Sequence, residues 1–401
     1  MTYALEMLYT YLGESLFYFT MHRMKIGIVT HYSANNMGAI LQCFALQEAL
    51  KELQPGALVK VLDFRRKERL HRPLYADVYK YKAKGSLAPL KGLAHIYYAF
   101  RQRMKSGVSH TQEFIDKYLD LEEVSLTEDK FLDVSGKGFN VLVAGSDQIW
   151  ADWSIQPYFL LGCSSYVDCK IAYAPSLGNI KSLSDRAVSM LSTAISEFDY
   201  ISCREEDGCD FISKMASIHC PCVPDPTFLL TRNQWRNIAK KPEKAPVRDF
   251  VFCYQISFEK MSLKIANAIA DKYGLEVVFK RYVEPYAFYA DIGPSEFLWY
   301  IMNAKFVVTS SFHCTLFSVF FGTPFLSIRS DAPQSRLTTL LKAVGLEDRL
   351  VLNLSQAMDL PDENFKVDKA KIQMLGEKGK LFLHEGLKSC NSRLLKGGKL
   401  G

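Results

Sequence analysis

The sequence predicts an α/β protein made of two doubly wound domains that face each other across a cleft. Apolar, strand-like runs alternate with segments of helical periodicity along most of the chain. A polar stretch with two prolines, residues 231–248, interrupts this alternation beyond the middle of the chain. The length of 401 residues also suits two or three domains.

The first predicted domain spans residues 24–235 and opens with a strand, a helix and a strand. Residues 25–30 form an apolar run, residues 40–53 carry apolar side chains at helical spacing, and residues 59–64 form a second apolar run. Such an order is typical of a parallel sheet. Further along, strands are predicted at 139–144, 170–174 and 200–203, and helices at 183–198 and 205–215.

The second predicted domain spans residues 249–355 and repeats the alternation. Its strands are predicted at 250–256, 275–279, 305–309 and 324–328, and its helices at 260–273, 295–303, from 313 onwards, and at 334–344. Residues 356–401 are polar, lysine-rich and helical in pattern, so a C-terminal helical tail is expected.

Residues 1–23 are expected to be an N-terminal extension outside the two domains. The segment is apolar, but Glu6 and Glu14 interrupt it and no basic residues precede it. A signal peptide needs that basic region, and a membrane span needs about 20 apolar residues. Neither is therefore predicted.

Charge is concentrated in one tyrosine-rich segment. The chain carries 49 basic and 43 acidic residues, and residues 65–105 contain twelve of the basic residues but only two acidic ones. The remainder is near neutral, so no nucleic-acid partner is expected. Two interpretations of 65–105 stay open: a solvated surface, or peripheral contact with an anionic membrane face.

The ten cysteines are too dilute for a disulfide scaffold. Cys220 and Cys222 are separated by one proline, and no second pair follows at the spacing of a zinc site. We therefore expect reduced thiols, a cytoplasmic protein and no metal.

Polar residues at the carboxyl ends of the predicted strands are the candidate site, because ligands bind there in open parallel sheets. His313 follows two serines at the start of a helix, where free N–H groups favour an anion. It is a candidate acid–base group, although a packed histidine fits the spacing equally well. Arg204 can bind a carboxylate or phosphate, or form a salt bridge with Glu205 or Glu206. The other candidates at strand ends are Asn35, Asn36, Gly38, Ser146, Asp147, Gln148, Asp225, Ser310, Ser311 and Arg329.

Four stretches, in order, resemble the polysaccharide pyruvyl transferase family. The resemblance implies two Rossmann-like domains, as in the GT-B glycosyltransferases. It also implies an enzyme that transfers pyruvate from phosphoenolpyruvate to two sugar hydroxyls as a ketal, in surface or exopolysaccharide biosynthesis. No cofactor is implied beside that donor substrate. The stretches are Ile26–Gln42, Gly145–Trp150, Ser202–Glu205 with Pro224–Thr227, and Thr309–Thr315.

The resemblance also implies roles for individual residues. It places His313 as the acid or base and Arg204 on the donor's anionic groups. From its position at a strand end, we expect Asp147 to orient the sugar hydroxyls, so these three residues are the catalytic candidates. Several relatives carry arginine where this chain has Ser311, so another arginine would have to supply that charge. We therefore expect the donor side to consist of Arg204, Ser310, Ser311, His313, Arg329 and Arg336, and the acceptor side of Asn35, Asn36, Gly38, Ser146, Asp147, Gln148 and Asp225.

Two other functions remain open from the sequence. One is a nucleotide-sugar-dependent glycosyltransferase of the same two-domain shape, and the other is a sugar-binding module without catalysis. The expected partner in each case is a sugar or a lipid-linked oligosaccharide. Contact through 65–105 would place the protein at the inner face of the membrane.

Overall fold

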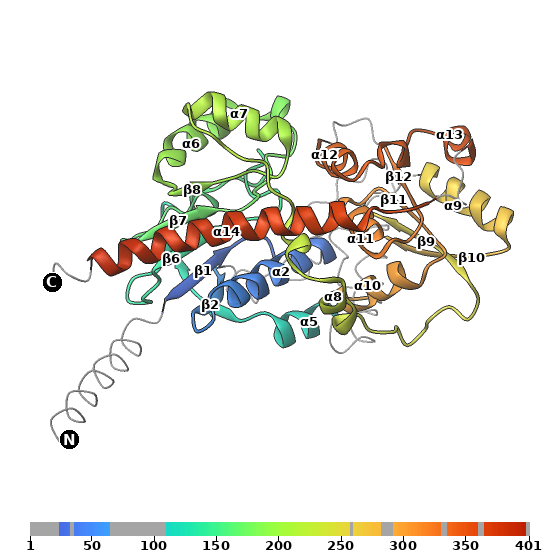
Figure 1. The fold of residues 1–401 in the computed structure, drawn as a ribbon, viewed down its shortest axis with the longest axis horizontal. Coiled ribbons are helices and arrows are strands. Elements are labelled where there is room, and N and C mark those ends of the chain that lie inside the picture. The colour runs from blue at the N-terminus through green and yellow to red at the C-terminus, as the bar shows by residue number, and fades with distance from the viewer. Residues whose placement is uncertain are drawn as a thin grey trace, which may run out of the picture.

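Two α/β domains, each built on a parallel sheet, make up the computed structural model (Figure 1). It describes residues 24–32, 36–64, 110–256, 260–281, 292–329, 335–359 and 365–397. The predicted extension 1–23 and the basic segment 65–105 lie outside these ranges.

The first sheet has six parallel strands in the order β3-β2-β1-β6-β7-β8. From β1 the chain adds β2 and β3 toward one edge of the sheet, and then β6, β7 and β8 toward the other edge. The topological switch point therefore lies between β1 and β6. The central strands are buried on both faces, which explains why the sequence shows them as unbroken apolar runs. The strands are β1 (Lys25–Val29), β2 (Leu58–Asp63), β3 (Leu121–Glu123), β6 (Val141–Ala144), β7 (Cys169–Ala172) and β8 (Tyr200–Ile201).

Helix α2 (Met37–Leu53) occupies the centre of the molecule. It contacts the first sheet, the second domain and the C-terminal helix, and most of its residues are buried. This environment explains its nearly continuous apolar sequence. The other helices of this domain are α5 (His110–Tyr118), α6 (Asp185–Ala194), α7 (Glu206–Ala216) and α8 (Arg232–Ile238), and a small hairpin joins β4 (Ser125–Leu126) to β5 (Leu132–Asp133).

The second sheet has five parallel strands in the order β10-β9-β11-β12-β13, with its switch point between β9 and β11. Two Rossmann-like domains in one chain confirm the predicted GT-B-like fold. The strands are β9 (Phe250–Gln255), β10 (Glu276–Arg281), β11 (Phe306–Thr309), β12 (Phe325–Ile328) and β13 (Leu350–Val351). The helices are α9 (Lys260–Tyr273), α10 (Pro294–Asn303), α11 (Phe312–Phe321), α12 (Ser335–Val344) and α13 (Leu354–Asp359).

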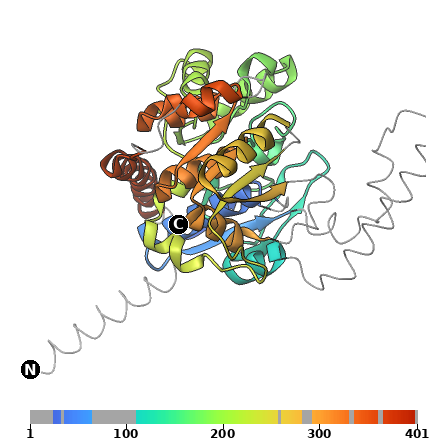
Figure 2. The same ribbon diagram turned by 90° about the vertical axis from the view of Figure 1, so that its right-hand side faces the viewer.

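The last helix, α14 (Lys369–Gly397), runs from the second domain back along the first, as the red helix of Figure 1 shows. Figure 2 views the same helix nearly along its axis. Leu383 and Leu387 are fully buried in the central core. Lys380 Nζ lies 2.8 Å from Glu52 Oε1 of α2. The predicted helical tail is thus a covering helix of the first domain. No helix in the described ranges is long and apolar enough to cross a bilayer.

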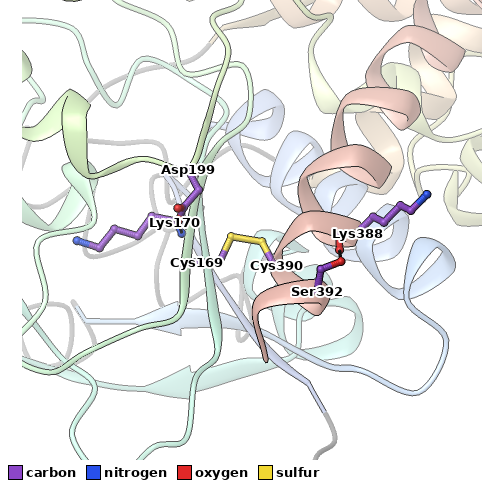
Figure 3. Close-up of a disulfide and its surroundings, with 6 residues drawn as sticks. All are labelled: Cys169, Lys170, Asp199, Lys388, Cys390 and Ser392. Atoms are coloured by element: carbon purple, nitrogen blue, oxygen red, sulfur yellow. Dashed lines mark hydrogen bonds between the residues drawn. A yellow bond between two sulfur atoms is a disulfide. The ribbon is translucent and has the colours of Figure 1, made fainter. Parts of the chain in front are cut away.

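A disulfide corrects the expectation that the thiols are reduced. Cys169 of β7 is bonded to Cys390 of α14 (Figure 3). The two residues are 221 positions apart. Short-range cysteine spacing was the only signal available from the sequence, and it carries no information about so distant a pair. The other eight cysteines form no disulfide within the described part of the chain.

Candidate active site

The N-termini of α2 and α11 meet where the two domains join. A Cβ atom on Gly38, in the first turn of α2, would overlap with the imidazole of His313. Glycine therefore allows this contact between domains. Asn36, predicted on the acceptor side, caps α2 by accepting hydrogen bonds from the N–H groups of Gly38 (3.1 Å) and Ala39 (3.4 Å). Asn35 lies outside the described residues.

His313 sits in the first turn of α11, a helix that is buried over its whole length. Ser311 is its N-cap and accepts a hydrogen bond from the N–H of Cys314 (3.4 Å), while Ser311 N–H donates to Thr309 Oγ1 (3.0 Å). The Ser311 hydroxyl is therefore engaged with the helix. The Ser310 hydroxyl is buried and has no hydrogen-bond partner in the described chain.

Asp225 bridges the two domains through one oxygen atom. Arg204 Nη1 donates to Asp225 Oδ2 at 2.6 Å, and His313 Nε2 lies 3.5 Å from the same oxygen. The other oxygen accepts hydrogen bonds from the N–H (3.0 Å) and hydroxyl (2.9 Å) of Thr227. Burial raises the pKa of Asp225, but His313 and Arg204 outweigh this and hold the pKa well below its usual range.

Arg204 is 4% exposed, yet only part of its guanidinium is satisfied. Besides Asp225, Nη1 donates to Ser146 Oγ at 3.3 Å. Nε lies 3.8 Å from Glu205 Oε1, and neither Nε nor Nη2 has a hydrogen-bond partner among the residues described. Buried, unpaired N–H donors are unfavourable unless a ligand or water satisfies them.

Arg336 of α12 brings a second cation to the same place. The Cζ atoms of Arg204 and Arg336 lie 4.8 and 5.6 Å from the centroid of the Phe312 ring. Burial, together with the positive charge of Arg204, lowers the pKa of Arg336 to about 10, so it remains charged at neutral pH. Arg329, the other predicted substitute, is exposed and makes no ion pair or hydrogen bond with this group among the described residues.

Asp147 follows β6 in the facing domain and is 7% exposed. Burial raises its pKa, but the charges of His31 and Arg204, with smaller contributions from His313 and Arg336, lower it overall. Its neighbour Ser146 is fully buried: its N–H donates to Gln42 Oε1 (3.0 Å) and its hydroxyl to the carbonyl of Ala174 (2.7 Å). Gln148 is half-buried.

Two neighbours of the site were not among the predicted residues. Glu205 is 1% exposed and accepts a hydrogen bond from the Ser176 hydroxyl, and burial raises its pKa. His31 Nε2 lies 2.7 Å from Ser154 Oγ, and its charge acts on Asp147. His31 directly follows the first strand, so the strand-end rule could have found it. Glu205 gave no separate signal, because it was interpreted only as a partner of Arg204.

The arrangement is suited to a small molecule with two anionic groups. Two arginines, an unpaired serine hydroxyl and the N-terminus of α11 offer donors and positive charge. Asp147 and His313 supply a carboxylate and an acid–base group beside them. The described residues include no cluster of three or more histidine, cysteine or carboxylate side chains able to hold a metal ion.

Comparison with known structures finds similar proteins at low identity. MnaA from S. aureus with UDP has a TM-score of 0.46 and 10% identity, covering 89% of this chain and 91% of that one. UGT71G1 from Medicago truncatula with UDP-glucose has a TM-score of 0.47 and 11% identity, covering 92% and 98%. At these values the ligands of those proteins say nothing about this chain.

A comparison with family models is more specific. A search of curated protein sequences finds no relative. The model of the polysaccharide pyruvyl transferase family matches residues 36–332, well over half of the chain and including every residue of the Arg204–Asp225–His313 group. This match confirms the resemblance seen in the sequence: the chain is a transferase that belongs to the polysaccharide pyruvyl transferase family.

Proposed function

We propose that this chain transfers pyruvate from phosphoenolpyruvate to two hydroxyls of one sugar, forming a cyclic ketal on a surface or exopolysaccharide precursor. The observation that carries the proposal is the pair of guanidiniums beside the Phe312 ring, with the buried Nε and Nη2 of Arg204 lacking a hydrogen-bond partner in the part of the chain that the structure describes. Phosphoenolpyruvate bears a carboxylate and a phosphate on one carbon, so both of its anionic groups fit two adjacent cations.

This chain has Ser311 where several relatives have an arginine, and this difference is compatible with the proposal. Ser311 caps α11, so it supplies no cation. Arg336 approaches the same Phe312 ring from α12 and replaces the missing charge from another element. Arg329 is exposed and is the weaker candidate.

In the proposed reaction, His313 protonates the methylene carbon of the donor, which makes the neighbouring carbon electrophilic. One sugar hydroxyl adds to that carbon, phosphate leaves, and the second hydroxyl closes the ketal. Two hydroxyl protons are lost: one replaces the proton given by His313 and the other leaves with phosphate. Since the pKa of Asp147 is lowered, this carboxylate orients the hydroxyls as a hydrogen-bond acceptor.

The test is phosphate release from phosphoenolpyruvate in the presence of free and lipid-linked galactosides and mannosides. Arg336→Gln is expected to lower kcat/KM by about 10²-fold or more, because a charge on the transferring group is lost. His313→Gln is expected to lower kcat by about 10²–10⁴-fold. Arg236→Gln, an exposed arginine of α8, is the control and should change neither value.

Near-normal turnover by His313→Gln would refute the assignment of the acid. Consumption of a UDP-sugar by a chain that releases no phosphate from phosphoenolpyruvate would support the glycosyltransferase alternative instead. Binding of sugar with neither reaction would leave only the non-catalytic module.

A further inference from the structure

Trp153 is a large aromatic side chain that the fold leaves exposed. It lies in the segment after β6, and 69% of its surface is accessible, whereas Trp150 and Trp235 are fully buried. A single exposed apolar residue is ordinary on a protein surface. Trp153 differs because another side chain holds its ring in place.

That side chain is His31, at the end of β1. The two rings are stacked, with centroids 5.6 Å apart and planes inclined by 8°. His31 is itself fixed by two contacts. Its Nε2 lies 2.7 Å from Ser154 Oγ, and its ring packs edge-to-face against Phe159 with the ring centroids 4.6 Å apart. The indole is therefore backed by an ordered neighbour, and little conformational entropy is lost when a ligand covers it.

The stacked pair adjoins the switch point of the first sheet. His31 follows β1 and Trp153 follows β6, the two strands between which ligands bind in this type of sheet. The charge of His31 is the strongest of those that lower the pKa of Asp147, so the pair lies within electrostatic range of the predicted acceptor carboxylate. The cations of the donor group act on the same carboxylate.

We infer that the Trp153–His31 pair is the platform on which a pyranose ring of the acceptor saccharide stacks, with Asp147 accepting a hydrogen bond from its hydroxyls. This inference rests on the proposed function. The face of an aromatic ring is electron-rich, so it attracts the C–H groups on the apolar face of a sugar. A nucleobase would also stack, but its phosphates would meet the ionised Asp147. A neutral saccharide avoids that repulsion.

Saturation-transfer NMR with methyl β-D-galactopyranoside and methyl α-D-mannopyranoside tests the platform without requiring turnover. Irradiation of aromatic protons should saturate C–H protons on one face of at least one sugar. Trp153→Ala should reduce the signal by about 5-fold or more, and Trp153→Phe should retain most of it, because a phenyl ring still offers a face. Tyr166→Ala removes another exposed ring, 85% accessible, and should leave the signal unchanged.

Equal saturation in Trp153→Ala, or none in the wild type with either sugar, overturns the inference. Displacement of the sugar by equimolar UDP also overturns it, in favour of a nucleotide.

Phosphate release separates this failure from that of the proposed function. With an active acceptor, Trp153→Ala should raise the acceptor KM by about 10-fold while kcat changes less than about 3-fold. An unchanged KM refutes the platform alone. A Trp153-dependent sugar signal without any phosphate release refutes the proposed reaction alone.

Discussion

Asp225 Oδ2 is the atom that Arg204 and His313 share, although the two side chains come from different domains. The carboxylate is 2% exposed and its second oxygen is held by Thr227. The sequence suggested that it binds the acceptor. In the structure it faces the two catalytic candidates, so its charge positions them and offsets the cost of burying a guanidinium.

We predict that Asp225→Asn lowers the free energy of unfolding by about 3–5 kcal/mol at pH 7, because Arg204 is left buried without its counter-ion. The loss should shrink as the pH falls. The native carboxyl stays ionised below its ordinary pKa of 3.8, while the unfolded chain binds a proton there, so acid removes this stabilisation from the wild type only.

Urea unfolding at pH 7, 4 and 3 measures both effects, because the unfolded carboxyl binds its proton mainly below pH 4. Asp249→Asn serves as the control, since its side chain is 67% exposed and pairs only at 3.5 Å with Lys305. A difference between Asp225→Asn and wild type that stays constant over this pH range would contradict the prediction.

Single residues of the site were predictable where a strand ends. Arg204, Asp147 and His313 follow β8, β6 and β11, and parallel strands place their carboxyl ends at one edge. Arg336 came from the resemblance, because a helix position gives no such signal. The contact of Phe312 with two arginines could not be predicted, since an apolar residue at helical spacing indicates core packing.

At the level of elements, α14 carries a clear division between buried and exposed positions. Leu387 is fully buried in the central core, whereas Leu381 on the same helix is 57% exposed. Leu387→Ala is predicted to lower the free energy of unfolding by about 2–5 kcal/mol, because it leaves a cavity. Leu381→Ala is the matched control and should change it by less than about 0.5 kcal/mol. Equal losses in urea unfolding of the two variants would show that α14 does not dock as described.

Elements with long apolar runs were predictable. Among the short strands, β8 was predicted at 200–203, whereas β3 and β13 were not. The predicted runs at 25–30, 59–64 and 250–256 correspond to β1, β2 and β9. Strands β3 and β13 have three and two residues, too few for any period to show. They join their sheets through neighbours that are distant in sequence, and no local pattern records that pairing.

At the level of the whole molecule, two parallel sheets follow from the alternation of strands and helices, but the return of α14 to the first domain does not. Its docking depends on contacts between residues hundreds of positions apart, as with Lys380 and Glu52. The Cys169–Cys390 bond links α14 covalently to β7 of the first domain. In a chain-entropy estimate, closing so long a loop stabilises the fold by up to about 5 kcal/mol.

Cleavage inside that loop should leave the two halves joined. A specific protease site inserted at Val247, which is 99% exposed between α8 and β9, is expected to yield one band on a denaturing gel without reductant and two bands with it. The same insertion with Cys390→Ser should give two bands in both lanes. If the two fragments separate without reductant in the variant that keeps Cys390, the disulfide bond is disproved.

The distance between these two cysteines also sets an order of events during synthesis. Cys390 is added 221 residues after Cys169, and ribosomes add about 5–20 residues per second. Cys169 therefore remains a thiol for at least about ten seconds after translation has passed it. Formation of the bond then reports that α14 has left the ribosome and reached β7.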